Sequence, residues 1–422
     1  MLLSQRRLFA GHFFSHSFCL GASEQKSAAS IYPQRDTRTT GVIMTKIIFK
    51  NDAQRQYINI DWNKVVARLE ELKNVKESLG NKHFTQSVRE WAESLEIEEQ
   101  IRLLNVTLGG LSNDDASVGV YATRPEDYER FAPFLEPIIR EYHKISGETK
   151  QHHDWNIPVG EYVLTKIDPS LDRVSMRARV ARNVNGWNLP SSMSQDERVQ
   201  FEAYMEGIFA GLSIAGKYHS LTPGHAAELS QEEADQMRRD HMLFNDMTTD
   251  NHLTSSGIAS HWPHGRGIWV SEDETKMIWI GEEDHLRIIS IVHGNDLGVV
   301  DKSLSDLLTA MENAGVAFAM HPTYGVITTC PTNMGTGKRQ SILGMFPNLS
   351  KRGTDEANLK RIAKELGLQA RGLSGEHSQM DERGTADISP SARFGVTEAE
   401  VTKRLYEGLR ALYAREKEAG QE

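Results

Sequence analysis

A lone cysteine stands at the head of a glycine-containing loop that ends on two basic residues. Cys330 follows the apolar run 324–327 and begins the sequence Cys-Pro-Thr-Asn-Met-Gly-Thr-Gly-Lys-Arg, residues 330–339. The only other cysteine, Cys19, lies near the N-terminus, so no internal disulfide can involve the rest of the chain. Spacing alone favours a buried cysteine that packs as a small hydrophobe. The loop that follows points to chemistry instead, because glycines let a backbone approach a bulky anion.

Two kinds of side chain could bind phosphate here, a lysine or a set of arginines. Residues 335–338 partly match a phosphate-binding Walker loop, but Thr332 occupies the place of its first glycine and no Ser or Thr follows Lys338 directly. We therefore reject a lysine-centred mechanism. Arginine is the alternative, because its planar fork binds phosphate oxygens bidentately and keeps its charge.

The whole segment 330–339 resembles the active-site signature of the phosphagen (guanidino) kinases, which are the arginine and creatine kinases and their relatives. Further segments resemble the same family in the same order, and the motifs are closest to those of arginine and taurocyamine kinases. These segments are 175–179, 240–244, 265–269, 281–290 and 371–377. The resemblance extends over roughly residues 50 to 418. It implies an α+β fold, with a small all-helical N-terminal domain followed by a larger domain in which helices flank an antiparallel sheet.

The resemblance implies that ATP and ADP are bound through arginines. By position the phosphate-binding residues are Arg177, Arg179, Arg287, Arg339 and Arg371, and His241 is expected to contact the nucleotide as well. Any one of these arginines alone could equally be a solvated surface residue. Mg²⁺ is expected to sit chiefly on ATP oxygens and water, with Glu282 holding some of those waters.

The acceptor implied by the resemblance is the guanidinium of a small molecule. A guanidinium is a cation and a poor nucleophile, so it needs carboxylates that orient it and receive its proton. Glu283 and Glu376 match the two glutamates in this role. Cys330 is expected to be a thiolate that positions the substrate electrostatically, its pKa lowered by hydroxyls and positive charge. The stretch 371–393, which carries Glu376, is expected to close over the substrate.

The far end of the substrate is expected to be an anion. Residues 116–121 resemble the arginine kinases' Ser-Gly-Val-Gly-x-Tyr, whose N–H groups and tyrosine hydroxyl hold a carboxylate; this implies substrate contacts from Ser117, Val118, Gly119 and Tyr121. The first two positions differ, and a sulfonate would fit N–H groups as well. We therefore favour arginine narrowly over taurocyamine. A protein-arginine kinase, which would share only the catalytic half, and a catalytically dead binding module are the remaining alternatives.

Three departures from the family pattern bear on this site. Leu343 stands where the family has a histidine beside the adenine, which keeps an apolar wall but removes a polar ring. Gly281 replaces an asparagine. Residues 180–183, Val-Ala-Arg-Asn, replace a glycine-bearing sequence after the paired arginines.

Hydrophobic periodicity predicts the elements that position these residues. Helices are expected within 61–104 and near 128–145, the latter bent or interrupted by Pro133 and Pro137. Residues 109–115 are predicted to be a loop. Strands are expected at 267–270, 277–280, 286–292 and 325–329, and helices at 357–366 and after a capping box formed by Thr397 and Glu400. The expected regions are 1–45 (presequence or disordered tail), 46–146 (helical domain), 147–160 (linker) and 161–420 (catalytic domain).

Composition limits the partners and the compartment. The 422 residues are 39% hydrophobic and 25% charged with a net charge of -10, which argues against nucleic acid or an anionic membrane as a partner. No apolar run approaches the roughly 18 residues of a membrane helix. Residues 1–43 contain Arg6 and Arg7 and no acid before Glu24, so a mitochondrial presequence is expected, or else a tail upstream of an alternative start at Met44 in a cytoplasmic protein. The oligomeric state stays open.

Overall fold

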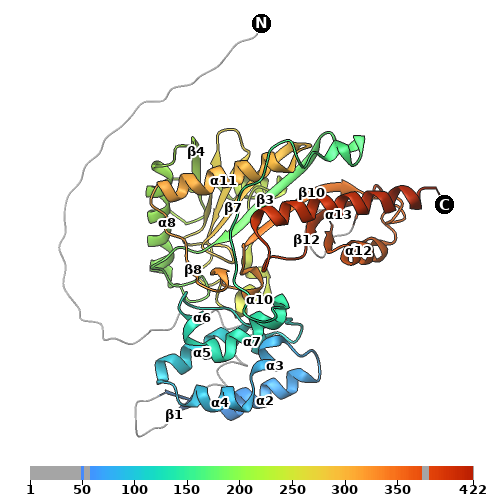
Figure 1. The fold of residues 1–422 in the computed structure, drawn as a ribbon. Coiled ribbons are helices and arrows are strands. Elements are labelled where there is room, and N and C mark those ends of the chain that lie inside the picture. The colour runs from blue at the N-terminus through green and yellow to red at the C-terminus, as the bar shows by residue number, and fades with distance from the viewer. Residues whose placement is uncertain (1–48, 52–57, 373–379, 422) are drawn as a thin grey trace, which may run out of the picture. The chain divides into compact units, whose positions relative to one another are not determined.

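The computed structural model describes residues 49–51, 58–372 and 380–421 (Figure 1). The described chain opens with a small antiparallel pair of strands, β1 (Phe49–Asn51) and β2 (Ile58–Ile60). The first region is therefore helical apart from this pair. Its helices are α2 (Trp62–Lys73), α3 (Leu79–His83), α4 (Gln86–Glu93), α5 (Ile97–Ser112), α6 (Asp127–Arg130) and α7 (Ala132–His143).

The loop predicted at 109–115 is wrong for residues 109–112, which belong to helix α5, whereas residues 113–115 lie beyond the helix. The helix runs through Gly109 and Gly110 to Ser112, because the two glycines provide close packing. A Cβ at Gly110 would lie 2.5 Å from the carbonyl oxygen of Gly119, and one at Gly109 would lie 2.6 Å from the ring of Tyr121. The glycines thus let residues 117–121, the segment expected to bind the substrate, lie directly against the helix.

The helix predicted near 128–145 is two helices, α6 and α7, which meet at Phe131. Pro133 lies in the first turn of α7, where its missing N–H costs nothing, and Pro137 lies inside that helix. The buried face of α7 is Phe134, Leu135, Ile138 and Ile139. This face packs in one core with Tyr324, Ile327 and Met334 from the cysteine loop region.

Eight strands of the described chain form one antiparallel sheet, in the order β11-β12-β10-β3-β7-β6-β5-β4. The strands are β3 (Val174–Arg182), β4 (Gly216–Ser220), β5 (Gly267–Ser271), β6 (Lys276–Ile280), β7 (Leu286–Gly294), β10 (Lys338–Met345), β11 (Leu368–Arg371) and β12 (Thr385–Pro390). The associated helices are α8 (Gln195–Ala210), α9 (Gln231–Arg239), α10 (Asn251–Ser255), α11 (Leu297–Asn313), α12 (Glu356–Glu365) and α13 (Glu398–Ala419). Short 3₁₀ turns are η1 (Leu164–Lys166), η2 (Pro169–Leu171), η3 (Met247–Thr249) and η4 (Pro331–Asn333). The α+β fold class is confirmed.

Most of the expected strands are present, but the prediction of a strand at 325–329 is wrong. Only β9 (Gly325–Val326) forms there, and it pairs with β8 (Met320–His321) outside the main sheet. The chain instead pairs with its own glycine loop, since the Val326 N–H donates to Gly335 O and the Gly335 N–H donates to Tyr324 O, both at 2.9 Å. This arrangement holds Cys330 between two anchored segments.

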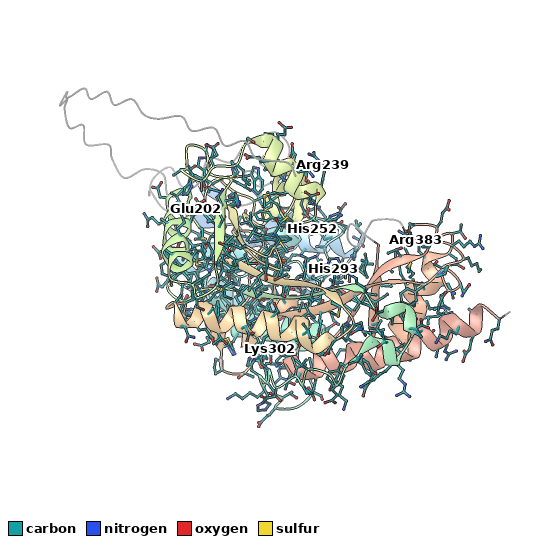
Figure 2. All side chains as sticks on the ribbon, turned by 90° about the horizontal axis from the view of Figure 1, so that it is seen from above. Glu202, Arg239, His252, His293, Lys302 and Arg383 are labelled. Atoms are coloured by element: carbon teal, nitrogen blue, oxygen red, sulfur yellow. The ribbon has the colours of Figure 1, made fainter. Side chains whose placement is uncertain are left out.

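The two faces of the sheet have different coverings. Helices α11 and α13 pack on one face, and their apolar residues share a core with Met176, Val180 and Ile288 of that face (Figure 1). Figure 2 shows Lys302 of α11 and His252 of α10 on opposite sides of the sheet. The capping box predicted at Thr397 and Glu400 begins α13. None of the helices within the described residues has the length and apolar character needed to cross a bilayer.

Candidate active site

Strand register places the five candidate arginines on one face of the sheet, the face that α11 and α13 leave uncovered. Arg179 of β3 is paired with Arg339 of β10, and Arg177 lies two residues from Arg179. Arg287 of β7 is opposite Ala181, two residues on from Arg179. Arg371 of β11 is opposite Asp387 of β12. Since directly paired residues share a face and alternate residues repeat it, the five guanidinium groups belong to the same surface.

The arginine face has fewer partners than its charge requires. Arg287 Nη2 lies 2.6 Å from Glu282 Oε2 and 3.4 Å from Glu283 Oε2, and Arg339 Nη1 donates to Asp387 Oδ2 at 3.0 Å. Arg177 lies over the ring of Trp279, 5.7 Å from its centroid. On this face, within the part of the chain that the structure describes, four buried guanidinium nitrogens lack a hydrogen-bond partner: Arg177 Nε, Arg287 Nε, Arg339 Nε and Arg339 Nη2. Such buried donors call for an anion.

Electrostatics gives the same conclusion. Burial lowers the pKa of Arg177 to about 10, with Arg339 and Arg287 adding to the effect and Asp387 opposing it. Burial and the neighbouring Arg287, Arg177 and Arg339 hold the pKa of Arg179 well below its ordinary value. The like charges of Arg177, Arg179 and Arg339 therefore suit a polyanion that would offset them.

The lysine of the glycine loop takes no part in this face. Lys338 points to the opposite side of the sheet, where its fully buried ammonium pairs with Asp301 of α11 and donates to Glu398 O at 2.8 Å and Thr402 Oγ1 at 3.0 Å. The rejection of a lysine-centred phosphate site therefore agrees with the geometry.

A carboxylate and a thiol lie together at one end of the arginine face. Burial, with the nearby Asp284, raises the pKa of Glu283 to about 7. Burial and the Glu283 carboxylate raise the pKa of Cys330 to about 12, although a hydrogen bond to Thr332, with Sγ and Oγ1 3.2 Å apart, opposes the shift. The expected thiolate with a lowered pKa is therefore wrong for the ligand-free protein, because its nearest charge is negative.

The turn that carries Glu282 and Glu283 is held from three sides. Gly281 has φ +71°, and a Cβ at this position would lie 2.9 Å from Gly265 O, so glycine suits the turn. The buried Arg266 donates from Nε to Gly281 O at 3.0 Å. Asn183, from the segment that replaces the family's glycines, donates to Asp284 Oδ1 at 2.7 Å, and the same oxygen accepts the Thr329 N–H at 2.7 Å. Asp284 thus links the glutamate turn to the cysteine segment.

Residues 117–121, the segment expected to bind the substrate, approach the same end. The pKa of Tyr121 is raised by burial and then by the charges of Cys330 and Glu283, so its ring lies near both. The Ala122 N–H donates to Thr329 O at 2.8 Å. Gly119 has φ +75°, and the backbone N–H groups of residues 117–120 donate to no group within the described ranges. Lys76 Nζ lies 3.0 Å from Ser117 Oγ. These groups suit an anion.

Of the remaining candidate residues, one stands apart from the cluster. His241 is exposed after α9; its chain neighbour Met242 accepts a hydrogen bond from Trp279, whose ring lies beneath Arg177, so His241 is connected to the face only indirectly. Glu376 lies outside the described residues. Leu343, half-buried on β10, is opposite Asp387 and therefore lies on the arginine face.

Sequence reasoning missed three residues of this site. Trp279 and Asp387 are opposite Arg287 and Arg371, so only the strand register reveals them. Arg393 is the last residue of the stretch 371–393 and hydrogen-bonds Asn333 of η4. The sequence indicated Arg393 only by its place at the end of this polar stretch.

An arginine face for a polyanion, beside a carboxylate and a thiol, defines an enzyme of phosphoryl transfer. Residues 200–419 match the family model described as ATP:guanido phosphotransferase, C-terminal catalytic domain, and residues 74–140 match ATP:guanido phosphotransferase, N-terminal domain. The chain belongs to the ATP:guanido phosphotransferase family. It is a guanidino phosphotransferase, a phosphagen kinase.

Known proteins similar to the chain differ in the substrate that their names give. The arginine kinase of Turbo cornutus is 36% identical over 315 residues, which are 73% of this chain and 84% of that protein. The arginine kinase of Liolophura japonica is 33% identical over 365 residues, which are 85% of this chain and 98% of that protein. The duplicated taurocyamine kinase from Schistosoma mansoni with bound transition state analog components has a TM-score of 0.71 at 28% identity; the match covers 83% of this chain and 48% of that one, about half its length. The crystal structure of lombricine kinase has a TM-score of 0.71 at 27% sequence identity, and the match covers 88% of this chain and 98% of that one.

Proposed function

We propose that the chain catalyses reversible phosphoryl transfer from Mg·ATP to the guanidinium of arginine, for energy buffering. The observation that carries the proposal is the single face of five arginines with Glu283 and Cys330 at one end. A triphosphate supplies the anion that the unpartnered arginine N–H groups need. A guanidinium supplies the cation that the buried carboxylates need.

The arginine face positions the nucleotide. The phosphates are bound by the five arginines of this face, Arg177, Arg179, Arg287, Arg339 and Arg371. The same guanidinium groups stabilise the negative charge that spreads over the transferring group. Leu343 provides an apolar wall for the base on the same face. His241, beside the Trp279 contact, approaches the nucleotide from the α9 side.

Glu283 and Cys330 receive the guanidinium. The cation pairs with the Glu283 carboxylate and favours the Cys330 thiolate, which reverses the rise in that group's pKa. The N–P bond forms as the bond from the γ-phosphorus to the bridging oxygen breaks, ADP leaves with that electron pair, and the guanidinium proton passes to a carboxylate, Glu283 or Glu376. Cys330 forms no bond to the substrate. Of the stretch 371–393 that was expected to close, Arg371 and residues 385–390 belong to strands β11 and β12 of the sheet, so only the connection between these strands is left to exclude water during the step.

The metal fits this site as part of the nucleotide. No group of three His, Cys, Asp or Glu side chains suited to a metal occurs within the described residues. Glu282 Oε2 lies 2.6 Å from Arg287 Nη2, and this carboxylate would hold a bound Mg²⁺ through water. Bound Mg²⁺ supplies charge neutralisation on the phosphate oxygens.

The distal end of the substrate decides its identity. The open N–H groups of Ser117, Val118 and Gly119 accept an anion, and the Tyr121 hydroxyl lies on the side of Cys330. Because Tyr121 is near both Cys330 and Glu283, the guanidinium and the anion belong to one small molecule, which favours a small substrate over a protein arginine. The sequence relatives named arginine kinases support arginine. Taurocyamine is the second candidate, since its sulfonate suits the same N–H groups.

The test is ADP release by purified residues 44–422 with Mg·ATP and one acceptor at a time: arginine, taurocyamine, glycocyamine, creatine or an arginine-bearing peptide. The proposal expects turnover with arginine well above the rest. Preference for taurocyamine would identify taurocyamine as the substrate, and the proposed phosphoryl transfer would still hold. Activity on the peptide alone would contradict the small-molecule proposal, and no turnover with any acceptor would leave a binding module.

We also propose that residues 1–43 direct the protein to mitochondria. The proposal rests on Arg6, Arg7 and the lack of acids before Glu24. A fluorescent protein fused after residue 43 should accumulate in mitochondria. Diffuse cytoplasmic signal would instead favour translation from Met44.

A further inference from the structure

We propose that the ring of His293 stacks on the base of the nucleotide, on the side opposite Leu343, an inference that rests on the proposed function. Leu343 stands where the family has a histidine beside the adenine, so this chain has no ring at that position. His293 lies near the end of β7, which is separated from β10 by β3 alone. The missing ring is thus supplied from the other side of the same base.

Strand register places His293 on the arginine face. His293 is directly opposite Ser175 of β3. The preceding residue Val292 packs with Met176 in the core on the side of the sheet that α11 and α13 cover. Because successive residues of a strand point to opposite faces, His293 and Ser175 both point to the uncovered face (Figure 2).

Leu343, Ser175 and His293 form one row across three strands. Ser341 is opposite Arg177, so Leu343, two residues farther along β10, reaches the level of Ser175. Neighbouring strands lie about 4.8 Å apart, which puts the backbones at Leu343 and His293 roughly 10 Å apart. A stacked base occupies about 3.4 Å. The row therefore accepts one flat base with a side chain on either side of it and the small Ser175 beneath.

This row lies where the base must be if phosphate is transferred at Glu283. Glu283 precedes β7, so the γ-phosphate belongs at the start of that strand and the base belongs farther along it. Arg177, the last arginine of the face in this direction on β3, is opposite Ile291, two residues before His293. A nucleotide whose phosphates reach Arg177 thus brings its base to the next row.

The His293 ring is available for such a contact. Its side chain is exposed, whereas those of Ser175 and Leu343 are half-buried, and within the described ranges it makes no hydrogen bond or ion pair. Histidine rings stack on bases, and stacking does not depend on the groups at the edge of the base. The pair of Leu343 and His293 would therefore make the site prefer a nucleotide to an inorganic polyphosphate, which the arginines bind equally well.

The experiment compares calorimetric binding of Mg·ADP with that of inorganic tripolyphosphate and Mg²⁺, both without a guanidine. His293→Leu should weaken Mg·ADP binding about 5- to 30-fold, because the stacking contact is lost. Tripolyphosphate binding should stay unchanged, because the arginines remain. His293→Phe should keep most of the affinity for Mg·ADP, since a ring is retained. Unchanged Mg·ADP binding in His293→Leu, or equal losses with both ligands, would overturn the inference.

Two surface variants are the controls. His152→Leu removes another exposed histidine, from the segment between the two regions. Arg383→Gln removes a charge from a side chain that is 72% exposed and pairs with Asp381 (Figure 2). Neither change should alter Mg·ADP binding. A loss in His152→Leu as large as that in His293→Leu would contradict a specific contact.

A second substitution tests whether the two side chains contact the same base. In a Leu343→His background a ring is present on the other side of the base. The loss of Mg·ADP affinity caused by His293→Leu should there shrink to less than about threefold, because residues that share one partner have non-additive effects. An undiminished loss would show that the two side chains do not share the base and would contradict the inference.

These binding measurements do not depend on turnover. If the parent protein bound Mg·ADP and His293→Leu weakened that binding, but no guanidine received phosphate, the proposed function would fail and the inference about His293 would stand. With an active enzyme, His293→Leu should raise the KM for ATP by a similar factor and leave kcat and the KM for the guanidine unchanged. A lowered kcat at an unchanged KM for ATP would overturn the stacking role.

Discussion

Arg179 and Arg339 are directly paired across strands β3 and β10, so two guanidinium groups share one face of the sheet with no carboxylate between their strands. Among the described residues, Asp387 on the next strand is the one carboxylate that pairs with Arg339. The two guanidinium groups therefore repel each other in the ligand-free protein, and a bound polyphosphate would reduce this repulsion.

Removing one of these charges should stabilise the ligand-free protein and damage the enzyme. Burial and three neighbouring arginines disfavour the charged form of Arg179. Arg179→Met should therefore raise the free energy of unfolding by roughly 1–2 kcal/mol and lower kcat/KM by about 10²-fold or more. Urea titration and initial rates measure both, and Arg383→Gln should change neither. A less stable, fully active Arg179→Met would contradict the polyanion site.

Cys330 should react slowly with an alkylating agent at neutral pH. Its pKa is raised to about 12 by burial and by Glu283, and only the thiolate reacts. In a Cys19→Ser background, the iodoacetamide rate should rise with pH up to at least pH 10 without reaching a plateau. Glu283→Gln should increase the rate at every pH in this range, since it removes a negative charge. A plateau below pH 8 in the parent protein would show that Cys330 is a thiolate near neutral pH and would contradict the raised pKa.

Acid should destabilise the protein through His285. Its Nδ1 accepts the Val184 N–H at 3.0 Å and its Nε2 donates to Asn188 O at 2.8 Å, so the ring is neutral, and burial lowers its pKa to about 4. The unfolded chain binds the proton near the ordinary value of 6.5, so the folded state loses stability as pH falls from about 6.5 toward 4. His285→Gln should reduce this slope in urea titrations. An identical slope in both proteins would exclude His285 as a cause.

The buried pair of Lys338 and Asp301 should behave as a unit. Lys338→Met leaves a buried carboxylate without its cation and should cost about 3–5 kcal/mol. The double variant Lys338→Met with Asp301→Leu should recover most of that loss, because both charges leave together. Denaturant midpoints of the four proteins form the test. Additive losses would show that the two side chains do not act on each other.

Gly110 should control binding of the guanidine without affecting the nucleotide. A methyl group there would displace Gly119 and the open N–H groups beside it. In Gly110→Ala the KM for arginine should rise about 10- to 100-fold while the KM for ATP stays constant. Gly207→Ala is the matched control, because that helical glycine has open space around its Cα. A tenfold rise in the KM for ATP as well would argue for general unfolding of the site.

Local patterns were sufficient to predict the elements whose periodicity is strong. The hairpin strands around 271–276, strand β7 and the capping box of α13 all follow from short stretches of sequence. The loop expected at 109–115 failed because glycine composition cannot distinguish a turn from a helix that needs close packing at Gly109 and Gly110. The strand expected at 325–329 failed because its partner is the distant glycine loop, which no local pattern shows.

The site was accessible from sequence only through whole motifs. Each arginine alone could have been a surface residue, and strand register alone brings Arg177, Arg339 and Arg371 to one face. The pKa of Cys330 was mispredicted because it depends on burial and on Glu283, which is 47 positions earlier in the chain. Asp387 and Arg393 were missed for the same reason, since their importance lies in contacts between distant segments.

The central claim is that the arginine face delivers a phosphoryl group to a guanidinium at Glu283 and Cys330. The most direct test is ³¹P NMR of the protein with Mg·ATP and arginine. The account predicts that ADP and a new N-phosphoryl resonance appear in equal amounts and that excess ADP reverses the reaction. Appearance of inorganic phosphate alone, or no change in the ATP signals, would contradict it.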